Sequence, residues 1–155
     1  MAFSTGYLAD PQAVGAGERY GPNQVILPAT VFEDNLKVGR FAKLDAGSLD
    51  NMDGSAAPVI AGVVIRHASD VADSAVIDAD LYDHVEYVRQ GLVTVDVKAG
   101  ETPARFGRVY VSNAGDANDG LATATGTDVS INAEFISEIQ TNVWLIFVGP
   151  TLGIS

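Results

Sequence analysis

The side chains of this 155-residue sequence that could do chemistry are a few acidic clusters and two histidines. The tightest cluster comprises Asp78, Asp80, Asp83 and His84. Carboxylates and an imidazole can bind a divalent metal ion, but this spacing matches no established ligand motif. Two other sets could suggest calcium, namely Asp45, Asp50 and Asp53, and Asp116, Asn118 and Asp119. Neither set has the EF-hand glycine and distal glutamate in register, so we interpret all three as solvated turns and predict no metal site.

His67 and His84 are the only histidines, and they are therefore the candidates for acid–base or nucleophilic catalysis. Neither lies in a GxSxG or HExxH frame. The sequence also contains no Walker loop and no GxGxxG motif after an expected strand. We interpret both as surface or structural histidines. We predict that the protein is not an enzyme, with no catalytic residues and no cofactor.

The segment Ala75–Tyr87, AVIDADLYDHVEY, resembles the uridine-contacting motif of trimeric dUTP pyrophosphatases, which are all-β proteins of similar length. Their motif continues into Tyr-Arg-Gly-Glu, whereas here Tyr82 is followed by Asp83 and His84. The Arg-Ser-Gly phosphate loop and the Arg-rich C-terminal tail of that family are missing. Gripping a triphosphate needs that positive charge. A dUTPase-like nucleotide hydrolase therefore stays only as an alternative function.

The charge balance bears on which partners the protein can have. The net charge is −11, and the nine Lys and Arg residues are scattered singly. A field of this sign repels nucleic acid and anionic lipid, so we expect no nucleic-acid and no membrane partner. The acidity either keeps the protein soluble or complements a basic patch on a partner. There is no cysteine, no apolar run of 18 residues and no pattern that indicates a signal peptide.

The elements around these residues are organised on the stretch Gly91–Val111, GLVTVDVKAGETPARFGRVYV. Val93, Val95 and Val97 alternate with polar residues, which predicts a strand with one dry face. Gly100 and Pro103 then indicate a turn, and Gly107 opens a second strand. The stretch predicts a rigid β module with no reactive group.

Other segments predict further strands. We expect strands at Gln24–Leu27, Leu36–Leu44, Val59–Ile65, Tyr82–Gln90, Asn132–Ile139 and Val143–Val148. Gly62 marks a bulge or the close approach of another backbone, and Val143–Val148 is expected to be central and covered on both faces. Asp45–Pro58 is expected to be a loop, and Ser69–Ala79 fits helix or strand. Short strands without a convincing long helix indicate an all-β antiparallel sandwich or small barrel, with a jelly-roll-like arrangement as one option.

The first residues differ from this body, which we place at residues 25–155. Met1–Gln24 contains four Gly, two Pro and no sustained period, yet it carries spaced apolar residues. Such a segment suits an extended N-terminal arm that docks on a neighbour, the first strand of the fold, or a loose tail. We therefore divide the chain into an arm at residues 1–24 and the body, and we predict that the adhesive side chains of the arm are Phe3, Tyr7, Leu8 and Tyr20.

The aromatic residues also allow a sugar-binding platform. Trp144 and the five tyrosines could stack on a carbohydrate. Because Trp144 lies in the middle of an apolar run, we interpret it as a core or interface residue. A carbohydrate- or receptor-binding β module of a virion is therefore a second alternative function.

From Leu36 onward the order of these features resembles the structural cement or head-decoration proteins of tailed bacteriophages. The resemblance covers about two thirds of the chain and rests on Ala61–Val64, Gly91–Val95, Gly107–Val111, a Gly-containing turn and the final apolar strand. The N-terminal arm and the unusually apolar last strand depart from that pattern.

The resemblance implies a small structural protein on the outer surface of a virion capsid. It would bind the major capsid protein and clamp neighbouring capsomers, and that family has no catalytic residues. A homo-trimer, or a dimer, would suit sites on capsid symmetry axes. Many copies would make a weak contact effective through multivalency.

Overall fold

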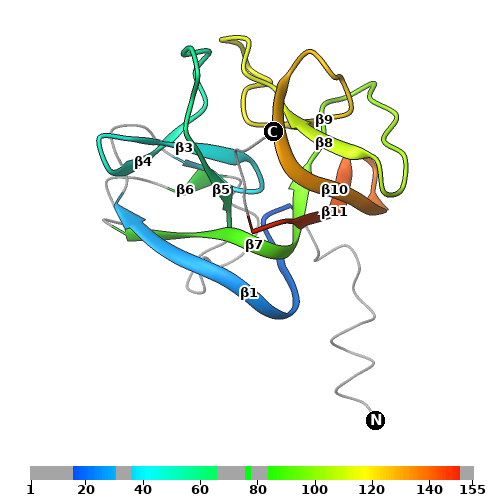
Figure 1. The fold of residues 1–155 in the computed structure, drawn as a ribbon, viewed down its shortest axis with the longest axis horizontal. Coiled ribbons are helices and arrows are strands. Elements are labelled where there is room, and N and C mark those ends of the chain that lie inside the picture. The colour runs from blue at the N-terminus through cyan, green and yellow to red at the C-terminus, as the bar shows by residue number, and fades with distance from the viewer. Residues whose placement is uncertain (1–15, 31–35, 66–75, 78–83, 151–155) are drawn as a thin grey trace.

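The computed structural model describes residues 16–30, 36–65, 76–77 and 84–150, which form an all-β fold without a helix (Figure 1). In chain order the strands are β1 (Arg19–Thr30), β2 (Leu36–Lys37), β3 (Phe41–Asp45), β4 (Ser48–Asn51), β5 (Ile60–Val64), β6 (Val76–Ile77), β7 (His84–Asp96), β8 (Arg108–Val111), β9 (Ala122–Thr123), β10 (Val129–Gln140) and β11 (Val143–Val148). The all-β prediction is confirmed. Within these described ranges, no helix could span a membrane.

Most of the described strands join one curled antiparallel sheet. Its order is β4-β3-β5-β7-β11-β10-β8-β9, and β1 pairs separately with β7. One edge of β7 pairs with β1, while the other pairs first with β5 and then with β11. The short strands β2 and β6 form a separate two-stranded sheet. In Figure 1, β1 lies at the periphery, with β7 between it and the other strands.

The sheet curls back on itself at the end of β7. Val97 forms a parallel bridge with Ala122 of β9, and the Lys98 amide donates to the Ala122 carbonyl at 3.0 Å. This contact brings the last strand of the sheet order back to β7, so one half of the fold resembles a small barrel. Its interior is filled by a cluster of buried side chains that includes Val93, Phe135 and Ile146.

A second core lies against the other half of the sheet. It contains mostly aliphatic side chains from β2 to β5 and from β7, namely Leu36, Val38, Ala42, Leu49, Ala61, Val64, Val85 and Tyr87. Neighbouring residues of β5 serve different cores, because Ile60 and Val63 belong to the barrel cluster whereas Ala61 and Val64 belong to the second core. This explains why all five residues of β5 are buried.

Several expected elements are confirmed. β7 and β8 flank the turn that contains Gly100, whose φ is +86°, and β5 falls inside the apolar run Val59–Ile65. A Cβ on Gly62 would lie 2.2 Å from the Val88 carbonyl oxygen, so the close backbone approach is real. β11 is central in the sheet, but Phe147 is exposed and the strand is not covered on both faces.

Three details of the sequence interpretation are wrong. The expected strand Leu36–Leu44 is split into β2 and β3, because Gly39 adopts a φ of +77° between them. The expected loop Asp45–Pro58 contains β4, which forms a hairpin with β3 through Ala46 and Gly47, both at positive φ. The period-two pattern of Asn132–Ile139 predicts that Phe135, Ser137 and Ile139 share one face. In β10 the register shifts after Phe135, so Ser137 is exposed and does not share its buried face.

The tight approach at Gly62 generates a stability prediction. Gly62→Ala would push β5 away from β7 and should lower the free energy of unfolding by about 2–3 kcal/mol, as expected for overpacking. Urea denaturation followed by circular dichroism measures this. Gly126→Ala is the matched control, since a Cβ there would meet only Tyr110 atoms at 3.7 Å or more. Equal unfolding midpoints for both variants would show that the sheet accommodates the methyl group.

Candidate adhesive surface

Three apolar side chains from three adjacent strands form a row on the outward face of the sheet. The strand register places Tyr20 of β1 opposite Leu92 of β7, and Leu92 opposite Phe147 of β11. Directly opposed residues on antiparallel strands point to the same face. Tyr20 and Phe147 each keep 41% of their surface exposed, and Leu92 is half-buried. We call Tyr20, Leu92 and Phe147 the outer row.

Polar residues extend this row at one end. Phe147 lies opposite Glu134 of β10, and Glu134 lies opposite Arg108 of β8. Both of these charged side chains are exposed. Neighbouring strands lie about 4.8 Å apart, so the three apolar residues extend about 10 Å across the strands, and Glu134 and Arg108 extend this by about another 10 Å. An apolar centre beside exposed charges is the usual composition of a protein–protein contact surface.

A glutamine side chain fixes the geometry of the outer row. The Gln24 amide nitrogen donates to the Tyr20 carbonyl and, at 3.1 Å, to the Leu92 carbonyl. These bonds close a bulge where β1 shifts its register against β7. A Cβ on Gly91 would lie 2.7 Å from the Gln24 Cγ, so only glycine leaves room for this side chain. The backbone that carries Tyr20 and Leu92 is therefore well defined.

The residues that precede β1 are also anchored. The Gly17 amide donates to the Thr94 carbonyl at 2.7 Å, and the Glu18 amide donates to the Thr94 hydroxyl at 2.9 Å. Ala16 is buried and packs beside Gly39. Residues 16–24 are thus attached to the sheet, and 19–24 are part of β1. The division of the chain at residue 24 stays a prediction, and any truncation that tests an arm should end at residue 15.

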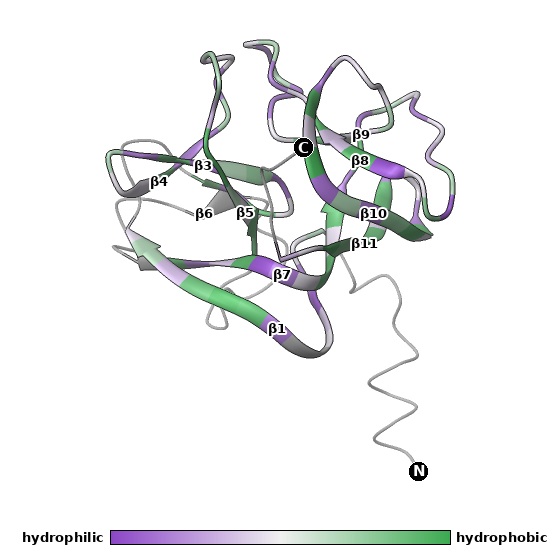
Figure 2. Cartoon of the chain, in the orientation of Figure 1, coloured by the Kyte–Doolittle hydropathy of each residue, from purple (hydrophilic) through white to green (hydrophobic). Residues whose placement is uncertain are grey.

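Of the four predicted adhesive residues, the structure describes one. Tyr20 lies in the outer row, whereas Phe3, Tyr7 and Leu8 lie outside the described residues. β1 continues the apolar surface beyond Tyr20, because Val25 and Leu27 are also partly exposed. Figure 2 shows this hydrophobic stretch along the middle of β1. The sequence interpretation missed Leu92 and Phe147, since their exposure follows from strand register and no local signal shows it.

The acidic sets considered for metal binding have other partners where they are described. Asp53 lies 2.7 Å from the buried Lys43 ammonium and Asp50 lies 3.9 Å from it. Hydrogen bonding to Lys43 and Ser55 lowers the pKa of Asp53 to about 2, and the bond to Asp53 raises the pKa of Lys43. In the other set, Asp119 accepts amide hydrogen bonds within its own loop. The solvated-turn interpretation is wrong for Asp50 and Asp119, which are buried.

The first acidic cluster considered for metal binding falls mostly outside the described residues. Asp78, Asp80 and Asp83 lie in the range 78–83, which the structure does not describe. His67 lies in another such range, 66–75. Of His84 only the backbone is described, as the first residue of β7. Among the residues that the structure describes, no three His, Cys, Asp or Glu side chains gather closely enough to hold a metal ion.

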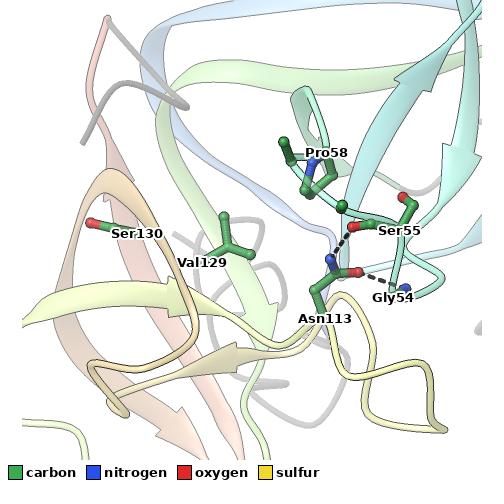
Figure 3. A pocket seen from close by; sticks show the side chains of 8 residues that line it. Gly54, Ser55, Pro58, Asn113, Val129 and Ser130 are labelled. Atoms are coloured by element: carbon green, nitrogen blue, oxygen red, sulfur yellow. Dashed lines mark hydrogen bonds between the residues drawn. The ribbon is translucent and has the colours of Figure 1, made fainter.

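Two loops meet at one end of the fold and enclose an open hollow (Figure 3). Asn113 joins them, because its side chain accepts from the Gly54 amide at 2.8 Å and donates to the Ser55 carbonyl at 2.9 Å. The hollow has a volume of about 620 Å³ and is lined by Gly54, Ser55, Ala56, Ala57, Pro58, Asn113, Val129 and Ser130. This lining includes no acidic, basic or imidazole group, so it offers no pair for acid–base chemistry.

Trp144 belongs to the core side of β11. It packs against the barrel cluster and meets Phe135 edge to face, with ring centroids 5.5 Å apart at 76°. Trp144 is partly buried, so its contact with the core agrees with the interpretation as a core or interface residue. This packing leaves its ring a poor platform for a sugar.

The fold and the outer row together define an all-β protein with a partly exposed apolar row on one face of its sheet. Residues 3–147 match the family of phage structural cement proteins described as "Structural cement protein (E217 gp24/Pam3 gp6)". A chain in the solved capsid of Myoviridae Phage XM1 is 30% identical and has a TM-score of 0.82. That similarity covers 98% of this chain and 100% of the other. No curated protein matches the chain.

The chain therefore belongs to the phage structural cement protein family. It is a structural protein of a phage virion capsid, in which it has a decoration or cement role. The family resemblance stated from the sequence is confirmed.

Proposed function

We propose that this protein binds the outer surface of the phage head through the outer row, and that it stabilises contacts between neighbouring capsomers. Its partner in this proposal is the major capsid protein. The observation that supports the proposal best is the register of β1, β7 and β11, which collects Tyr20, Leu92 and Phe147 on one outward face. The proposed role is structural throughout and has no catalytic step.

The energy available from this surface is suited to a cement. An aromatic side chain buries on the order of 200 Å² when fully covered, so the exposed two fifths of Tyr20 and Phe147 amount to roughly 160 Å². At about 25 cal/mol per Å², covering both yields about 4 kcal/mol before the costs of association. One such contact is weak, but copies repeated over a capsid act together.

β1 engages its partner through side chains in this proposal. As an edge strand it could in principle accept another strand on its free side. However, β1 contains Pro22 and Pro28 and shifts its register twice against β7. Prolines and bulges at an edge disfavour the addition of a strand. The exposed side chains of Tyr20, Val25 and Leu27 therefore remain the better contact.

The outer row generates the main prediction. The double variant Tyr20→Thr/Phe147→Thr should bind capsids at least about tenfold more weakly, because two partly exposed aromatic anchors are lost. Thr preserves strand propensity, so the fold should persist. Co-sedimentation with capsids assembled without this protein measures the affinity. Val59→Thr is the control, since Val59 is 63% exposed and lies outside the row. Unchanged binding by the double variant would refute the proposed surface.

The proposed arm has its own test. A chain that lacks residues 1–15 should keep its unfolding midpoint, because the anchoring bonds at Gly17 and Glu18 remain. It should bind capsids more weakly if Phe3, Tyr7 and Leu8 contact a neighbour. Full affinity in the same sedimentation assay would remove the arm from the mechanism.

We further propose that the protein assembles as a homo-trimer, with a dimer as the alternative. Closed symmetry suits a protein that occupies capsid symmetry axes. Light scattering coupled to size-exclusion chromatography should give three times the chain mass of 16.2 kDa. A single-chain mass at all concentrations would show that any assembly takes place only on the capsid.

A further inference from the structure

An exposed aromatic residue in a strained conformation lies in the loop that joins β7 to β8. Phe106 is 62% exposed and has a φ of +64°. A bulky residue at positive φ is a genuine outlier, because its Cβ crowds the backbone. Such strain persists only where the surroundings enforce it, and it points to a functional role more often than an ordinary loop does.

The surroundings of Phe106 hold its backbone on both sides. The Phe106 amide donates to the Phe135 carbonyl of β10 at 2.6 Å, and the Phe135 amide donates to the Gly107 carbonyl at 2.9 Å. The Gly107 amide in turn donates to the Ala104 carbonyl at 2.8 Å. The main chain is therefore tied to the sheet while the ring faces solvent. An exposed ring contributes little to the core, so the fold alone does not account for it.

The same loop carries a net positive charge although the chain as a whole is acidic. Residues 98–108 contain three of the nine Lys and Arg but one of the twenty Asp and Glu. That one acid, Glu101, accepts hydrogen bonds from the Ala124 amide and the Thr125 hydroxyl. The Arg105 guanidinium lies 4.9 Å from the centre of the Phe106 ring. Arg108 follows, opposite Glu134 of β10.

We propose that Arg105 and Phe106 form a second adhesive point, which binds a carboxylate-bearing surface of a capsid protein. The inference rests on the proposed function, because a clamp between two capsomers needs contacts at two places. The Phe106 ring would be covered while the guanidinium pairs with Asp or Glu side chains of the partner. Arg and aromatic residues are the types that dominate such contacts. This point lies beside the charged end of the outer row, where Arg108 opposes Glu134, and β7 and β11 separate it from Tyr20 in the sheet order.

Substitution by glycine separates the adhesive role from a structural one. Phe106→Gly removes the strain, so its thermal unfolding midpoint should equal or exceed that of the parent protein. The same variant should bind capsids about tenfold more weakly if the ring is an anchor. The control is Val59→Ala, which alters an equally exposed residue and should change neither property. Parental capsid affinity in Phe106→Gly would overturn the inference.

The charge of Arg105 in the second adhesive point is tested separately. Arg105→Glu should weaken binding and reduce its dependence on salt, because an attraction between opposite charges is screened by ions. An Arg105→Lys variant, treated with a carbodiimide on capsids, should form amide cross-links to Asp or Glu of the capsid protein. Cross-links only to another copy of this chain would overturn the assignment, as would an unchanged affinity of Arg105→Glu together with no cross-links.

Failure of this inference can be told apart from failure of the proposed function. If the parent chain binds capsids and the outer-row variant does not, the proposed function stands whatever the variants of Arg105 and Phe106 do. Parental affinity in those variants would then reject the second adhesive point alone. If the parent chain does not bind capsids at all, both are rejected.

Discussion

The described fold depends on β7, whose backbone is paired along both edges. One edge pairs with β1, and along the other edge the partner changes from β5 to β11. β5 pairs with Tyr87 and Val88, and β11 takes over from Gly91. Where β5 leaves, the Arg89 guanidinium donates to the Ile60 and Ala61 carbonyls at 2.8 and 2.9 Å. A buried carbonyl without a donor costs about 1–3 kcal/mol. Arg89 therefore allows β5 to leave β7 and β11 to take its place without leaving these carbonyls unpaired.

The pleat of β7 places core residues on one face and proposed contact residues on the other. Val93 points into the barrel cluster, while its neighbour Leu92 belongs to the outer row. In β11 the same alternation sets Ile146 inside and Phe147 outside. Successive residues of a strand face opposite sides, so a change to the outward set leaves the core nearly untouched. A cement protein can thus adapt its contact surface to a capsid while it keeps its fold.

Sequence patterns predicted the elements whose pattern is local. β5, β7 and β11 could be recognised because their apolar residues are contiguous or alternate. β4 could not, because its sequence SLDN has little strand propensity and its pairing depends on the turn at Ala46 and Gly47. Tyr20 could be proposed as adhesive from its type and position. Phe147 could not, because its place beside Leu92 requires the register of strands far apart in the chain. Phe106 could not be singled out either, because its positive φ depends on hydrogen bonds to β10 that the local sequence does not reveal.

The pairing of Asp96 with Val143 also has a consequence for how the chain folds. The barrel cluster is enclosed only when β11 is in place, and β11 is the last strand that the structure describes. During synthesis β7 leaves the ribosome long before the strand that covers its second edge. Contacts of such high sequence separation slow folding to milliseconds or seconds, and they leave the edge of β7 open meanwhile. Until β11 pairs with it, the exposed edge of β7 can pair with a strand of another chain, so incomplete chains are the ones most prone to aggregate.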